Sequence, residues 1–229
     1  MNIFKFLWNK IYATFILQDR YLIFLEGLKT TLILTFASFL LGTAFGILLC
    51  AATRSQNKTV KRIAVAVRTL VMETPTMMLL MILVYIVFGR SALPILWVVT
   101  VGLTLKTGSY LSEIFESALN TVAPGEIEAA RTLGMTKWQA FQNVTLPQTV
   151  VAALPLYRNQ FIASMQETSV VGYLAIVDLT RASSIVQSRT LDAFTGIMAV
   201  TLIYFIIGAL AKAFFHYVNA RMQKGGEAA

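Results

Sequence analysis

The sequence has few charged residues, only one cysteine and only one histidine. Only 13% of its 229 residues are Asp, Glu, Lys or Arg, while 57% are hydrophobic. A soluble domain carries about 25% charged residues, so this composition excludes an ordinary soluble protein and predicts a membrane protein. The single cysteine, Cys50, excludes a disulfide within the chain, and with only one histidine a multi-ligand metal site is disfavoured.

Nucleotide-binding motifs are also missing. The sequence contains neither a G-x-x-x-x-G-K-[ST] phosphate loop nor the G-x-G-x-x-G dinucleotide fingerprint. With so few titratable groups, no nucleophile beside a base stands out either. We therefore expect no catalytic residue, no metal and no cofactor on this chain. If ATP drives its activity, a separate subunit must bind the ATP and Mg²⁺.

The sequence instead contains several long apolar segments. The clearest is 31–52, which has no charge and is long enough, at about 1.5 Å per residue, to cross a bilayer core of about 30 Å. Four further apolar segments follow, at 70–88, 94–120, 150–170 and 193–211. We predict an all-α polytopic protein with five transmembrane helices in one domain, residues 1–229. Ser38, Gly42 and Gly46 are spaced for close helix packing, within the chain or between two copies.

Charge placement predicts the orientation. Residues 1–29 mix aromatic with charged side chains, which predicts an amphipathic segment at the membrane interface. Five positive charges between Arg54 and Arg68 predict a cytoplasmic loop, so five spans leave the N-terminus outside and the C-terminus inside. Nothing at the N-terminus resembles a cleavable signal peptide. We attribute the net charge of +8 to contact with lipid head groups rather than nucleic acid.

A polar segment, 122–147, interrupts the apolar ones. Pro124 suits a first helical position, and Gly134 can adopt the positive φ that ends a helix. Thr136 and Gln139 have the spacing of a capping box that opens a second helix. The sequence therefore predicts a helix–glycine–helix elbow between two spans. Such a surface suits docking, although an ordinary solvated helical hairpin would have the same pattern.

The elbow carries a family resemblance. Glu128-Ala129-Ala130, then Gly134, then Leu146-Pro147 resemble the EAA motif of bacterial ABC importer permeases, in the branch that imports polar amino acids such as histidine, glutamine and arginine. The likeness extends from about Gly27 to the C-terminus. In that family the elbow is the coupling helix, which docks into a groove of the ATPase. The resemblance implies that the ATPase-coupling residues are Glu128, Ala129, Ala130, Gly134, Leu146 and Pro147. We also expect Pro147 to mark the next boundary.

The same resemblance implies the partners. They are ABC ATPase subunits, an external solute-binding protein, and a second permease subunit that forms a homodimer or heterodimer with this chain in the bacterial inner membrane. Nucleic acid is not expected.

Ionisable and polar residues inside the spans are the candidates for a substrate pathway. A charge at mid-bilayer costs at least about 2.5–3.5 kcal/mol, so such residues are expected to face a water-filled path or one another. The candidates are Glu73, Thr74, Lys106, Tyr110, Glu113, Gln160, Ser164, Glu167, Thr168 and Ser169. A structural pair of Lys106 with Glu113 remains an alternative. For Gln160 and Ser164 we favour hydrogen bonds between helices.

At four positions, the charge of the residue in this sequence differs from the charge that is usual in the family. The resemblance implies Arg where Met72 and Glu116 stand, Lys where Gln166 stands, and an uncharged residue at Lys106. The spans are thus more negative than is usual, which favours neutral polar or basic substrates over acidic ones.

The resemblance implies the permease subunit of an ABC importer for polar or charged amino acids. Two alternatives stay open: an ABC permease for another small solute such as an osmolyte, and an ion-coupled secondary carrier. Against the carrier stands the absence of an inverted repeat. A membrane-embedded enzyme is disfavoured because no catalytic group of residues is present.

Overall fold

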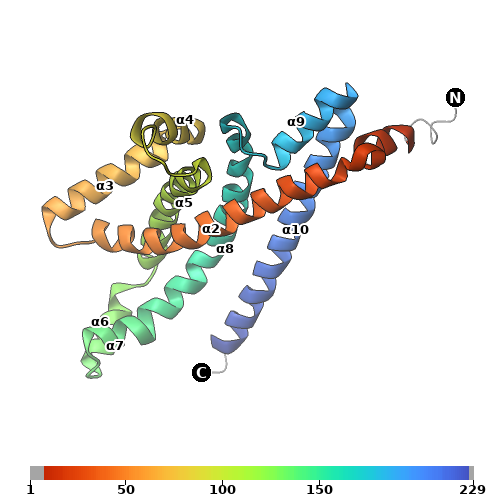
Figure 1. Cartoon of the computed structure of the whole chain (residues 1–229). Helices are drawn as coiled ribbons and strands as arrows, with labels where there is room; N and C mark the ends of the chain where they lie inside the picture. The colour runs from red at the N-terminus through yellow and green to blue at the C-terminus, as the bar shows by residue number, and fades with distance from the viewer. Residues whose placement is uncertain (1–7, 227–229) are drawn as a thin grey trace. The chain divides into compact units, whose positions relative to one another are not determined.

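The computed structural model describes residues 8–226, with side chains to residue 221. Every regular element in this range is helical. The π and 3-10 segments are η1 (Tyr12–Ile16), η2 (Leu17–Asp19), η3 (Ile82–Val87), η4 (Phe141–Thr145) and η5 (Thr168–Leu174). The α-helices are α2 (Tyr21–Thr53), α3 (Lys58–Glu73), α4 (Thr76–Met81), α5 (Ile95–Leu119), α6 (Pro124–Thr132), α7 (Lys137–Ala140), α8 (Leu146–Glu167), α9 (Leu179–Thr190) and α10 (Ala193–Gly226) (Figure 1).

Three helices, α2, α5 and α10, are each long and apolar enough to cross a membrane. The number rises to five if α3 with α4–η3, and the α7–η5 segment with α9, each count as one bent span. The predicted five is thus the upper count. The chain forms two compact units: unit 1 holds 1–38, 75–103 and 163–209, and unit 2 the rest. Since α2, α5, α8 and α10 each run through both units, no linker separates them.

Helix α2 begins earlier than the sequence predicts. Residues 21–29 belong to it, whereas we assigned them to an interfacial segment because of their charges. The helix accommodates Glu26 and Lys29 on its exposed side and turns Phe24 and Gly27 inward. A Cβ on Gly27 would lie 2.6 Å from the carbonyl oxygen of Asp178, so this glycine lets α2 pack against the start of α9. Residues 1–7 of the predicted segment lie outside the described range.

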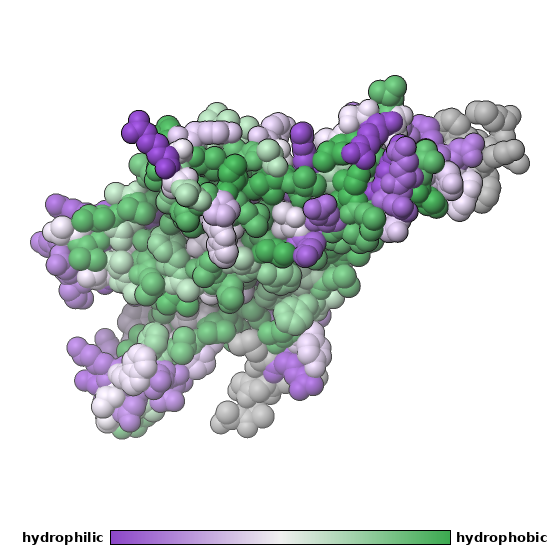
Figure 2. Space-filling model, viewed as in Figure 1, coloured by the Kyte–Doolittle hydropathy of each residue, from purple (hydrophilic) through white to green (hydrophobic). Residues whose placement is uncertain are grey.

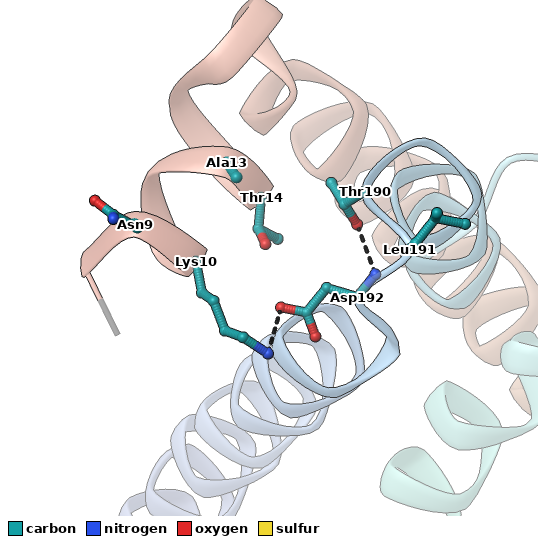
Figure 3. A pocket seen from close by; sticks show the side chains of 7 residues that line it. All are labelled: Asn9, Lys10, Ala13, Thr14, Thr190, Leu191 and Asp192. Carbon is teal, nitrogen blue, oxygen red and sulfur yellow. Dashed lines mark hydrogen bonds and ion pairs between the residues drawn. The ribbon is translucent and has the colours of Figure 1, made fainter. Parts of the chain in front are cut away.

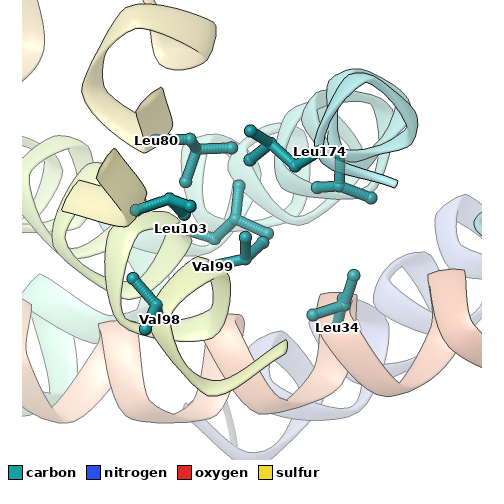
Figure 4. Close-up of a cluster of buried hydrophobic side chains, with 8 residues drawn as sticks. Leu34, Leu80, Val98, Val99, Leu103 and Leu174 are labelled. Carbon is teal, nitrogen blue, oxygen red and sulfur yellow. The ribbon is translucent and has the colours of Figure 1, made fainter. Parts of the chain in front are cut away.

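Two hydrophobic clusters form the core of unit 1. One gathers Leu34 of α2, Leu80 of α4, Val99 and Leu103 of α5 and Leu174 of η5 around a common centre (Figure 4). The second joins α2, α9 and α10 through Phe24, Leu179, Ala182, Val186 and Val200. Both clusters unite segments that are far apart in sequence, so they fix which helices are neighbours.

In unit 2 the small residues of α2 pack within the chain. A Cβ on Gly46 would lie 2.9 Å from the carbonyl oxygen of Gly108, and one on Gly108 would lie 2.8 Å from that of Gly42. The predicted ridge therefore serves close packing of α2 on α5, the first of its two expected uses. Beside it, the rings of Phe39 and Phe161 meet edge to face with centroids 5.0 Å apart.

The exposed surface is mostly apolar. Figure 2 shows hydrophobic side chains over much of the visible face, with hydrophilic ones at the α2–α3 turn and at the α6–α7 elbow. Leu40 and Leu48 of α2 are 73% and 69% exposed, and Phe205 of α10 is 72% exposed. Large apolar side chains on long helices are stable in this position when lipid surrounds them, because a bilayer core contains no water.

Candidate functional site: the α6–α7 elbow and the end of α3

The first half of the elbow forms as its residues predict. Helix α6 begins at Pro124, and Glu126 lies in its first turn, where a carboxylate is stabilised by the helix dipole. The side-chain amide of Gln148, near the start of α8, donates a hydrogen bond to the carboxylate of Glu126. The elbow is therefore tied at its base to the helix that follows it.

Gly134 ends α6 in a Schellman motif. The N–H of Gly134 donates to the carbonyl of Arg131 at 3.1 Å, and the N–H of Met135 donates to that of Ala130 at 3.2 Å. Gly134 has a φ of +89°, which L side chains rarely adopt, although no atom lies within 4 Å of where its Cβ would be. Backbone conformation, and not space, thus requires glycine here, as predicted.

Helix α7 opens with the predicted capping box. The hydroxyl of Thr136 accepts from the N–H of Gln139 at 3.2 Å, and the Gln139 side chain accepts from the N–H of Thr136 at 2.8 Å. The boundary predicted at Pro147 is present, because α8 begins at Leu146, one residue before it. The chain nevertheless stays helical across this boundary, since the π segment η4 leads directly into α8 and the N–H of Leu146 donates to the carbonyl of Phe141.

Five of the six predicted coupling residues are exposed: Glu128, Ala129, Gly134, Leu146 and Pro147. The sixth, Ala130, is only 5% exposed and packs inside the elbow. A partner that docks on the elbow can therefore contact Ala129 but not the side chain of Ala130.

Two large apolar residues of the elbow were missed by the sequence analysis. Leu133 is 82% exposed and Trp138 is 63% exposed, on either side of the turn at Gly134. The Trp138 ring stacks on Phe141 with centroids 5.6 Å apart, which restricts its motion. The signal was their size within an otherwise polar segment. Exposed apolar side chains on a polar element are typical of a protein-docking surface.

The second candidate feature is the break between α3 and α4, within the span that the sequence predicts as one helix over 70–88. Helix α3 ends at Glu73, and Thr74 and Pro75 are extended, with ψ angles of 126° and 136°. Proline disfavours the helical conformation in the residue before it, which explains the break. The last carbonyls of α3 consequently lack helical partners.

Lys106 of α5 supplies those partners. Its ammonium donates to the carbonyl oxygens of Val71, Met72 and Thr74 at 3.1, 2.8 and 2.6 Å. It also lies 5.4 Å from the centroid of the Tyr110 ring, a cation–π distance. Lys106 is 3% exposed, so this is a buried cation at the negative end of a helix dipole. Lys106 and Thr74 were both predicted pathway residues, and their contact at this helix end was not predicted.

The remaining pathway candidates have different surroundings. Glu73 and Glu113 are exposed on this single chain. Gln160, which belongs to unit 2, is 8% exposed. The candidates in unit 1 are Ser164 and Thr168, which are 2% and 0% exposed, and Glu167 and Ser169, which are half-buried. The Thr168 hydroxyl donates to the carbonyl of Met165 at 2.7 Å.

Glu116 has a partner that the sequence analysis did not assign. Its carboxylate forms an ion pair with Arg68 of α3 and accepts from the Thr53 hydroxyl at 3.5 Å. Nearby, Arg54 donates to the side-chain oxygen of Asn120 at 2.7 Å. Two of the five basic residues that predicted a cytoplasmic loop therefore also join the ends of α2, α3 and α5. Neutralised by Arg68, Glu116 adds little to the negative charge of a pathway.

Comparisons with known proteins agree with this architecture. The chain is 28% identical to the probable amino-acid permease protein YxeN of Bacillus subtilis (strain 168), with 80% of this chain and 84% of the relative covered. It is 29% identical to the glutamate/aspartate import permease protein GltK of Escherichia coli O157:H7, with 86% and 92% covered.

Among solved structures, the crystal structure of an amino acid ABC transporter with histidines superposes with a TM-score of 0.80 at 29% identity, covering 87% of this chain and 94% of that one. The MetNI methionine ABC transporter, at 20% identity and a TM-score of 0.75, shows the same fold. The profile of a family described as "Binding-protein-dependent transport system inner membrane component" matches residues 42–224. Because the match covers most of its length, the chain belongs to this family of transport-system membrane subunits.

Proposed function

We propose that this chain is the permease subunit of an ATP-driven ABC importer that takes up amino acids. Its curated relatives are named as amino-acid permeases, and its neighbour at 29% identity is an amino acid ABC transporter. These relatives are transport subunits rather than enzymes. The external binding protein delivers the amino acid, and a second permease subunit completes the pathway.

The observation that carries this function is the exposed elbow. It is held rigid by the Schellman motif at Gly134 and the capping box at Thr136, and it presents Glu128, Leu133 and Trp138 to a partner. We propose that the ATPase, which binds ATP and Mg²⁺, docks here. Rigidity matters for this role because a partner's movement is transmitted only through an element that does not bend.

A matched pair of leucines tests the docking role. Leu133→Asp places a charge on the elbow, while Leu191→Asp changes a leucine that is 92% exposed in the α9–α10 turn. We expect Leu133→Asp to abolish co-purification with the ATPase and ATP-dependent uptake in reconstituted vesicles, and Leu191→Asp to preserve the ATPase interaction. Unchanged co-purification and uptake for Leu133→Asp would reject the docking surface. Uptake that needs an ion gradient but no ATP would reject the importer.

We also propose that the pathway passes the break between α3 and α4. Non-helical backbone at membrane depth is tolerated only where protein buries it or where it lines a cavity, and broken helices line the substrate sites of many transporters. Glu73 and Thr74 stand at this break, and Lys106 and Tyr110 adjoin it. The other pathway candidates rest only on being polar or ionisable residues within the predicted spans. They are Glu113, Gln160, Ser164, Glu167, Thr168 and Ser169.

The orientation is a further proposal. We place the elbow, the α2–α3 turn and the C-terminus in the cytoplasm and the N-terminus outside, on the strength of the positive charges between Arg54 and Arg68. Single cysteines at Ser55 and Ser188 provide the test in a variant that lacks Cys50. Ser55 is half-buried and Ser188 is exposed. An impermeant thiol reagent applied from outside should label position 188 only. Labelling at position 55 alone would reverse the orientation.

A further inference from the structure

Unit 1 contains a pocket that is lined by none of the coupling or pathway residues. It has a volume of about 340 Å³ and lies between the N-terminal segment and the α9–α10 turn (Figure 3). This volume is within the range of about 300–1,000 Å³ that is usual for small-molecule sites. The lining residues are Asn9, Lys10, Ala13, Thr14, Thr190, Leu191 and Asp192.

The pocket carries charges of both signs, one from each of the two segments that line it. The ammonium of Lys10 lies 3.2 Å from a carboxylate oxygen of Asp192. Asp192 is held in place by the first turn of α10, where it accepts from the N–H of Thr195 at 3.4 Å and from its hydroxyl at 2.8 Å. A ligand in the pocket therefore meets a carboxylate held by Thr195 and the ammonium of Lys10 beside it.

Thr14 provides the independent sign of a ligand. It is 1% exposed, and its hydroxyl has no hydrogen-bond partner among the described residues. Threonines in helices commonly donate to the carbonyl four residues back, as Thr35 and Thr43 do in this chain. The Thr14 hydroxyl instead points into the space beside Lys10 and Asp192 (Figure 3). Since a buried hydroxyl without a hydrogen-bond partner is destabilising, a ligand oxygen that accepts from it would be stabilising.

The position of the pocket identifies the kind of ligand. Asp192 directly precedes Ala193, where the candidate span Ala193–Arg221 begins, so the pocket lies at the end of a membrane helix. Trp8 and Tyr12, on the same N-terminal segment, are 53% and 45% exposed. Exposed Trp and Tyr side chains at the end of a span are typical of the level of the lipid head groups.

We propose that this pocket binds the head group of a phospholipid that carries a phosphate ester and a primary ammonium, as phosphatidylethanolamine does. The phosphate accepts hydrogen bonds from Lys10 and Thr14, and the ammonium donates to Asp192. Phosphatidylcholine has a quaternary ammonium with no N–H to donate, and phosphatidylglycerol has no cation, so both bind more weakly. This site does not depend on which solute the chain transports.

Native mass spectrometry of the full chain, purified in detergent and given equal amounts of these three lipids, tests the proposal. We expect retention of phosphatidylethanolamine over the other two by about tenfold, the effect of one charge-assisted hydrogen bond. Thr14→Val and Asp192→Asn should each abolish the preference. Thr201→Val, whose exposed hydroxyl donates to the carbonyl of Ile197 and does not line the pocket, should preserve it.

Two further measurements separate a ligand site from a structural role. Without lipid, Thr14→Val should melt at the same or a higher temperature than the wild type, because it removes an unpartnered hydroxyl; a large loss of stability would make Thr14 a structural residue and contradict the site. Equal retention of the three lipids, or a preference unchanged in Thr14→Val, would overturn the proposal. Stabilisation by water-soluble phosphoethanolamine without lipid enrichment would assign the pocket to a soluble zwitterion and reject the lipid.

Discussion

Two helix ends in unit 2 solve the same problem in different ways. Helix α6 ends at Thr132, and the backbone N–H groups of Gly134 and Met135 satisfy its last carbonyls within five residues. Helix α3 ends at Glu73, and a lysine from α5, 32 to 35 residues away in sequence, donates to the carbonyls of Val71, Met72 and Thr74. The polar elbow is exposed, so water completes what the local motif leaves open. The α3 end lies within a candidate span, where water is scarce and a protein donor has to replace it.

Lys106→Met should give the largest effect, because it leaves three carbonyls at the end of α3 without a donor while it preserves side-chain length. We expect a loss of about 3 kcal/mol or more in stability, at about 1–3 kcal/mol for each unsatisfied group. Thermal melts of the purified chain in detergent measure it. Glu113→Gln, on the exposed side of the same helix, is the control and should leave the melt unchanged. A melt of Lys106→Met equal to that of the wild type would show that other donors satisfy this helix end.

Gly134→Ala should have a smaller effect, because only backbone conformation opposes a side chain there. We expect a cost of about 1–2 kcal/mol, confined to the elbow. Gly125→Ala is the matched control, since both glycines have open space around the added Cβ but only Gly134 has a positive φ. Hydrogen exchange should show faster exchange in α6 and α7 for Gly134→Ala and not for Gly125→Ala. Equal exchange in the two variants would mean that the motif does not hold the elbow.

The ion pair of Arg68 with Glu116 joins α3 to α5 and is partly exposed, so it should contribute less stability than the buried Lys106. Their side chains are 17% and 25% exposed. A double-mutant cycle with Arg68→Gln and Glu116→Gln should give a coupling of about 1 kcal/mol, well below the effect of Lys106. The measurement is the melt of the four proteins at low and high salt. A coupling as large as the loss in Lys106→Met would remove the distinction between these two ties.

Asp192 should give the smallest effect, because it caps the first turn of α10 locally and is close to solvent. The Thr195 hydroxyl lowers the pKa of Asp192 most, partial burial raises it, and Lys10 lowers it further. With a folded-state pKa below the unfolded one, the stabilisation is present above pH about 4 and is lost as the pH falls through the lowered pKa.

Melts of the wild type and Asp192→Asn from pH 7 to pH 3 test this assignment. The small difference between the two proteins should shrink toward acid, and Thr195→Val should shift that change to higher pH. A difference that grows toward acid would contradict the sign of the shift.

The comparison of the two helix ends also separates what could be predicted from what could not. Pro124, Gly134 and the pair Thr136–Gln139 place the elbow correctly because each acts on residues within five positions of itself. Pro147 lies within one residue of the start of α8, but the π segment η4, which keeps the chain helical across this boundary, was not predicted. The size of Leu133 and Trp138 stands out in a polar segment, but how far each is exposed depends on where neighbouring elements lie.

By itself, the sequence determined the membrane class, the apolar segments, the elbow and the family resemblance, since these depend on composition and on short-range backbone preferences. Only the tertiary structure decided that Lys106 caps α3, that Arg68 neutralises Glu116, that Gly46 packs on Gly108, and that Thr14 faces a pocket beside Asp192. Each of these contacts joins residues more than 30 positions apart. Their formation depends on which helices become neighbours, which is fixed by packing of buried side chains and not by any local pattern.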